Sequence, residues 1–144
     1  MDAPGEAVSS IALLVPAAFA ATRVWRATRS SAAALAAAHA AAIFVSAVLS
    51  ISYWTTGDRR TLRWDRFAAH VRLAVDVAAL TLALTLSIRA SMLPMCIALL
   101  AGGFYAAKCD VQYRNGDARV VTLLHTTWHV LGAVGEIALI RAAY

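Results

Sequence analysis

Charged residues are scarce in this sequence. Only 15% of its 144 residues are Asp, Glu, Lys or Arg, whereas 61% are hydrophobic, and the mean hydropathy is +0.68. A soluble domain of this size cannot bury so large a share of apolar side chains. The composition therefore excludes a water-soluble fold and predicts an integral membrane protein.

The sequence also has one lysine, two cysteines and no basic residue near its start. The single lysine, Lys108, lies at the end of a predicted helix, which disfavours a rhodopsin-like pigment. Cys96 and Cys109 are about 20 Å apart along one predicted helix, too far for a disulfide. Residues 1–10 contain no Lys or Arg, so they lack the basic region of a signal peptide, and we expect the first apolar stretch to be retained.

Basic residues are present but dispersed. The formal net charge is +5, and the Arg and Lys residues occur in the connections at both ends of the predicted helices. This distribution fits anionic lipid headgroups better than nucleic acid. Membrane lipids are therefore the expected partners, and the two sides differ too little in Lys and Arg to settle the orientation or the membrane.

Long apolar stretches dominate the chain. About 20 apolar residues span a bilayer, and polar turns separate five such stretches. They predict one all-α transmembrane bundle over residues 1–144, with Pro16 as a kink in the first span. The predicted spans are residues 8–24, 31–54, 67–88, 92–107 and 120–140, with turns near 26–30, 55–66, 89–91 and 108–119.

Polar side chains inside apolar spans are costly and therefore informative. With five spans, the second helix ends, and the third and fifth begin, at the same membrane face. His39 belongs to the opposite leaflet, about fifteen residues from Trp54. The leaflet in which the second helix ends and the third and fifth begin contains five polar residues: Ser50, Asp65, His70, His125 and His129.

The stretch HTTWH places His125 and His129 at i and i+4, so both imidazoles project from one helix face. Such a pair can share a metal ion, but zinc needs a third protein ligand and, in a catalytic site, keeps water in the fourth position. His70 has the matching depth. The pattern predicts a zinc site of these three histidines; the alternative is an ordinary packing pair.

The longer stretch HTTWHVLGAVG resembles the last-helix motif of the CREST superfamily, which includes alkaline ceramidases and progestin/adiponectin-type receptors. In the ceramidase branch an earlier helix ends in Ser-x-x-x-His, and an Asp follows eleven residues later. Ser50 and Asp65 keep this spacing around Trp54. The resemblance implies that His125 and His129 ligate zinc. It also implies that Asp65 deprotonates the zinc-bound water and that Ser50 stabilises the oxyanion.

The implied reaction is zinc-dependent hydrolysis of a lipid amide or ester. Zinc would lower the pKa of its bound water towards about 7. The chain departs from the family in two ways: Trp54 occupies the place of the third histidine ligand, and five spans are predicted instead of seven. Either His70 replaces the missing ligand or the centre no longer binds metal, so the sequence leaves enzymatic activity open.

Several of these residues also have a structural interpretation. Asp65 stands where a helix N-cap is expected, and Ser50 could simply pack in an alanine-rich helix. Arg72 and Asp76, spaced i and i+4, predict an intrahelical ion pair. Glu136 needs an internal partner that the sequence does not identify.

Two further functions fit the sequence. A small alanine-rich bundle with short loops is typical of a non-catalytic accessory subunit in a larger membrane complex, such as those of energy-converting organelles. A b-type haem held between His70 and His125 or His129 also has suitable depth, although one histidine of the pair would then be unused.

Overall fold

The computed structural model describes residues 8–24 and 30–144, and the regular structure in these ranges is α-helical. This confirms the all-α prediction. The predicted turn at 26–30 lies outside the described residues, apart from Ser30. After a helical turn at residues 8–11, the helices are α2 (Leu14–Val24), α3 (Ser30–Thr56), α4 (Arg59–Leu86), α5 (Ile88–Tyr113) and α6 (Ala118–Ala143).

Four helices in the described part of the chain, α3 to α6, are long and apolar enough to cross a membrane. The chain is therefore a multi-pass membrane protein. The first predicted span, Val8–Val24, is a shorter apolar helix that is interrupted at Ala12 and Leu13. The break lies one turn before Pro16, whose ring removes the amide that would bond the Ala12 carbonyl.

The connection between α3 and α4 is shorter than the polar stretch 55–66 suggested. Only Gly57 and Asp58 are non-helical. Gly57 has a φ of +66°, and Asp58 caps α4 by accepting a hydrogen bond from the Thr61 amide. Backbone hydrogen bonds, first from Arg60, hold the pKa of Asp58 below its usual value. The capping interpretation of Asp65 is therefore wrong, because Asp65 lies two turns inside α4.

The next two connections are also short, one residue between α4 and α5 and four residues between α5 and α6. Ser87 alone separates α4 from α5: its backbone amide donates to the Ala83 carbonyl, and its hydroxyl accepts from the Ala90 amide. The predicted turn at 89–91 is instead the first turn of α5. Asp117 caps α6 through the Arg119 amide. Charged residues thus extend the helices past the predicted boundaries, because helix ends can continue beyond the apolar core into the headgroup region.

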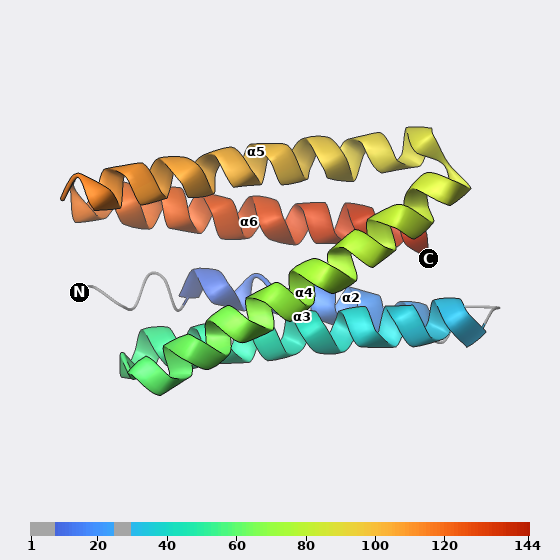
Figure 1. The fold of residues 1–144 in the computed structure, drawn as a ribbon, viewed down its shortest axis with the longest axis horizontal. Coiled ribbons are helices and arrows are strands. Elements are labelled where there is room, and N and C mark those ends of the chain that lie inside the picture. Colours follow the sequence, from blue (N-terminus) through green and yellow to red (C-terminus); the bar gives the residue numbers. More distant parts are fainter. Residues whose placement is uncertain (1–7, 25–29) are drawn as a thin grey trace.

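The helices form two pairs joined by an oblique one. In Figure 1, α5 and α6 run side by side, α2 lies along α3, and α4 crosses from the end of α3 to the start of α5. Helix α6 also contacts α4 and α2. It therefore packs against three other helices, as α4 does.

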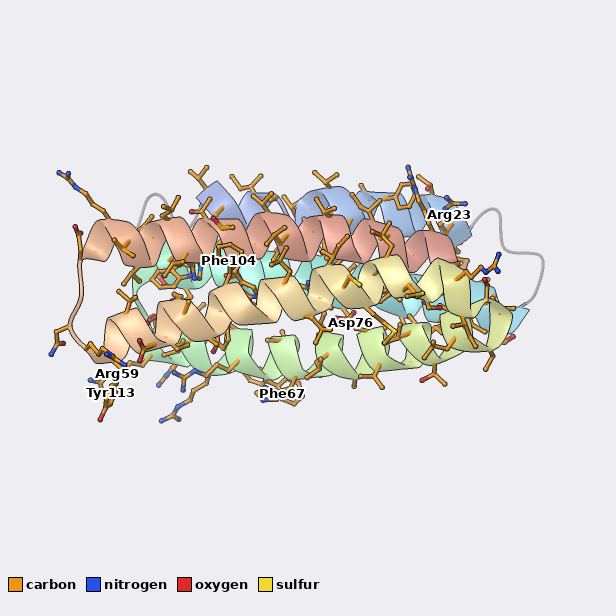
Figure 2. All side chains as sticks on the ribbon, turned by 90° about the horizontal axis from the view of Figure 1, so that it is seen from above. Arg23, Arg59, Phe67, Asp76, Phe104 and Tyr113 are labelled. Atoms are coloured by element: carbon orange, nitrogen blue, oxygen red, sulfur yellow. The ribbon has the colours of Figure 1, made fainter. Side chains whose placement is uncertain are left out.

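The interior is built from small and polar side chains. Buried alanines, including Ala47, Ala79 and Ala133, let the helices approach closely. Many large apolar side chains point outward, although Ile43 and Ile140 are fully buried: Leu99 is 77% exposed, and Phe67 lies on the outer side of α4 in Figure 2. An apolar exterior around a polar interior is the arrangement that a lipid environment favours.

Candidate functional site

One face of α6 carries three buried polar side chains. His125, His129 and Glu136 are 3%, 5% and 5% exposed. Their spacing of four and then seven residues follows the helical period, so they form one inward stripe. Two polar centres are built on this stripe. The first, which we call the histidine centre, consists of Ser9, Ser10, Ser50, Trp54, His125, Trp128 and His129; the second, the charged centre, consists of His39, Arg72, Asp76, Glu136 and Tyr144.

Hydroxyl groups link three segments in the histidine centre. The Ser10 Oγ lies 3.0 Å from the Ser50 Oγ and 3.4 Å from the His129 Nδ1. The Ser9 Oγ lies 3.2 Å from the same nitrogen. The chain before α2 thus joins α3 to α6, and it brings Ser50 and His129 together through a serine that the sequence analysis did not single out.

Aromatic rings enclose His125. Its ring lies 4.3 Å from that of His129 and 5.4 Å from those of Trp54 and Trp128, measured between ring centroids. Neither of its ring nitrogens has a hydrogen-bond partner, within the described residues. His125 is therefore buried among rings with its full hydrogen-bonding capacity unused.

His70 does not join the histidine pair. Its side chain is exposed on α4, and its Nδ1–H donates to the Arg66 carbonyl one turn earlier, at 2.6 Å. The haem arrangement that requires His70 opposite the pair therefore gains no support from the geometry. Asp65 is partly buried on α4.

Among the described residues, the histidine centre supplies fewer ligands than a catalytic zinc ion needs. Across residues 8–24 and 30–144, a single group of three or more His, Cys, Asp or Glu side chains brings its ligand atoms within 4.8 Å of one another, and it lies in the charged centre. His125 and His129 supply two ligands where zinc needs three. The indole of Trp54, in the third place, offers a donor N–H and no lone pair. The zinc site stays a prediction that this geometry does not favour.

The charged centre joins three helices near the middle of the bundle. The Nε2–H of His39, on α3, donates to Glu136 Oε2 at 2.9 Å, and the same nitrogen lies 3.0 Å from Asp76 Oδ1. Arg72 Nε donates to Glu136 Oε1 at 2.7 Å. Burial, followed by the nearby carboxylates, raises the pKa of Tyr144 to about 12, so its hydroxyl, 3.5 Å from His39 Nδ1, keeps its proton.

Sequence reasoning found this centre only in part. The predicted pair of Arg72 and Asp76 is present at 3.8 Å, but Arg72 bonds Glu136 more closely. The partners of Glu136 are His39 and Arg72. The position of these residues in the spans could have indicated the centre. Each lies well inside an apolar span, where an unpaired charge is unfavourable and a partner is expected.

The known proteins add no constraint to this geometry. Comparisons with family models, with curated proteins and with solved structures found no match to this chain. The function has to be inferred from the two polar centres themselves.

Proposed function

We propose that this chain is a non-hydrolytic membrane protein that binds the polar group of a membrane lipid at the histidine centre. The observation that carries the proposal is His125, which is 3% exposed and has no hydrogen-bond partner for either ring nitrogen in the described residues. Leaving a buried polar group unpaired costs about 1–3 kcal/mol. A bound hydrogen-bonding group would remove that cost.

The depth of His125 suits a lipid. It lies seven residues into the 26-residue helix α6, so about 10 Å separates it from the helix end. The helix is about 39 Å long, against an apolar core of about 30 Å. The imidazole therefore lies about one turn below the core boundary, where the ester, amide or hydroxyl groups of a lipid can reach it.

An apolar hollow along the middle of α3 and α4 offers room for a lipid tail. Its volume is about 450 Å³, and its walls come from α3 and α4. Leu49 and Trp64, which line it, are the sequence neighbours of Ser50 and Asp65. Phe67, also in its wall, lies on the outer side of the bundle in Figure 2, so the hollow faces the region that lipid would occupy.

The contact between Trp54 and His125 supports a CREST-like scaffold without its chemistry. The resemblance places a third ligand at position 54, and the Trp54 ring packs edge-on against His125 with 5.4 Å between centroids. Position 54 thus adjoins the histidine pair, as a ligand position should. Because indole cannot ligate zinc, this proposal contains no metal-activated water and no hydrolytic step.

Restoring the missing ligand tests this account of Trp54. We expect the wild-type protein, purified in mild detergent, to hold far less than one zinc per chain. Trp54→His should raise the zinc content towards one, and Trp54→Phe, the matched control, should not. Stoichiometric zinc in the wild type, lost in His125→Leu, would overturn the non-hydrolytic proposal and revive the zinc hydrolase.

Lipid binding is tested separately. Native mass spectrometry of protein extracted from membranes should show a retained lipid, and His125→Leu should reduce its occupancy about tenfold, which corresponds to about 1.4 kcal/mol. His70→Gln, a change at an exposed histidine, should leave it unchanged. Equal lipid retention by His125→Leu and wild type would contradict the proposed site. A tightly held protein partner in place of lipid would favour the accessory-subunit alternative.

A further inference from the structure

We propose that the charged centre is an intramembrane proton-binding site, in which one exchangeable proton is held between His39 and the carboxylates of Asp76 and Glu136. The proposal rests on a different set of residues from the histidine centre and does not depend on lipid binding there. It follows from three observations: the number of hydrogens available, the charge balance and the access to the site.

Two carboxylate oxygens lie beside His39 Nε2, but this nitrogen carries at most one hydrogen to donate. His39 is fully buried, and its Nε2 lies 2.9 Å from Glu136 Oε2 and 3.0 Å from Asp76 Oδ1. The single Nε2–H is aligned with Glu136. Asp76 Oδ1 is left without a hydrogen bond in the part of the chain that the structure describes, although it lies beside the same nitrogen. A proton that moves between this nitrogen and Asp76 serves both oxygens in turn.

The charges balance only when that proton is present. Asp76 and Glu136 are two negative charges, and Arg72 supplies one fixed positive charge against them. One proton on the imidazole, or on Asp76, makes the group neutral. Its loss leaves a net negative charge, and a divalent metal ion in its place would leave a net positive one. In a low-dielectric interior the neutral state is favoured, so the ligand that fits is a proton.

The described helices around His39 supply the charges in this count and, towards the Tyr144 end, two arginines besides. Helix α4 contributes Arg72 and Asp76, and α6 with the residue after it contributes Glu136 and the uncharged Tyr144. The two further charges are Arg23 on α2 and Arg141 on α6, and both guanidinium groups stack on the Phe19 ring.

The site has one open side and one closed side. The side chain of Asp76 is 24% exposed, and Tyr144 links His39 Nδ1 to the end of α6. Towards the histidine centre, about 10 Å of helix separates Glu136 from His129. Buried apolar side chains, among them Ile43 and Ala133, form the core there. Proton exchange is therefore expected from the Tyr144 end, without conduction through the bundle.

Nitrogen-15 NMR of histidine-labelled protein in lipid nanodiscs tests the proposal, because it separates imidazolium from neutral imidazole. The four histidines are assigned by changing them to glutamine one at a time. We expect His39 to be imidazolium at about pH 7 and to lose its proton reversibly at higher pH while the protein stays folded. His39 neutral at about pH 7, or charged up to the pH at which the protein unfolds, would overturn the proposal; the latter would indicate a fixed ion pair.

Two variants and one control sharpen the result. Asp76→Asn or Glu136→Gln removes a negative charge, so His39 should become at least tenfold less protonated at about pH 7. Asp110→Asn makes the same change in the exposed pair with Arg114 and should leave His39 unaltered. Should both centre variants fail to fold, the wild-type titration decides alone. One equivalent of a divalent metal in the wild type, absent from Asp76→Asn, would replace the proton with a metal ion.

Discussion

The two polar centres on α6 differ in how their histidines are satisfied. His39 lies at hydrogen-bond distance from two carboxylates at one nitrogen and is within 3.5 Å of a phenol at the other. His125 is equally buried but meets aromatic rings, and neither nitrogen has a partner in the described residues. Burial alone therefore says little about the role of a histidine. His39 bonds groups on other helices, whereas the unpaired nitrogens of His125 are the basis for the ligand proposed there.

The difference follows from what each neighbouring helix presents. Near Glu136, α3 contributes His39 and α4 contributes Arg72, and both side chains pair with the Glu136 carboxylate across the bundle. Near His125, α3 contributes Trp54, whose ring excludes water without offering a lone pair. The comparison gives four predictions, measured as the free energy of unfolding in mixed micelles.

The largest effect is expected where a saturated partner is removed. His39→Leu leaves Asp76 and Glu136 facing each other without the imidazole, and removing one member of a buried charged network costs about 3–5 kcal/mol. The unfolding curve should move accordingly. A loss below about 1 kcal/mol would mean that the charged centre does not hold α3 to α4 and α6.

The same substitution at the other centre should have the opposite sign. His125→Leu removes two buried nitrogens that have no partner in the described part of the chain and puts an apolar side chain of similar size in their place, so delipidated protein should gain about 1–3 kcal/mol. Adding membrane lipid should shrink the gain, because only the wild type would then be stabilised by binding. A loss of stability in delipidated protein would show that His125 already has a partner there.

The serine link should matter less. Ser10→Ala removes the hydroxyl within reach of Ser50 and His129, and a net hydrogen bond contributes about 0.5–1.5 kcal/mol. Ser31→Ala, at an exposed position in the first turn of α3, is the matched control and should change little. Equal effects at the two serines would argue against a role for Ser10 in joining α3 to α6.

The smallest effect is expected at an exposed ion pair. Arg114 and Asp110 are 3.0 Å apart, but their side chains are 74% and 57% exposed. Such pairs contribute about 0–1 kcal/mol, so Arg114→Gln should shift unfolding by less than the experimental spread. A loss comparable with that of His39→Leu would remove the distinction between buried and exposed charge on which the comparison depends.

Much of the fold was predictable from the sequence, but its boundaries were not. Apolar stretches identified the helices because hydrocarbon requires every backbone group to be bonded within the helix. The ends were misjudged wherever charged residues continued a helix past the membrane core, as at Asp65, where Asp58 is the cap instead. The first span was overestimated because Pro16 shortens the regular part of Val8–Val24.

For the candidate sites, the sequence predicted which residues share a face of one helix, but not which residues of different helices meet. The i, i+4 spacing of His125 and His129 correctly indicates a shared face, and their rings lie 4.3 Å apart. Depth suggested His70 as their companion, yet depth carries no information about the direction of a side chain around its helix. Ser10 was not anticipated because it lies outside the spans that depth reasoning compared.

By itself, the sequence determined that this protein is an all-helical, multi-pass membrane protein with ionisable groups inside its spans, because composition and periodicity act along a single helix. Only the tertiary structure decided that His39 meets Asp76 and Glu136, and that Trp54 rather than His70 stands against His125. Those outcomes depend on the rotation and crossing of separate helices. Side-chain packing sets both, and no spacing along the chain encodes them.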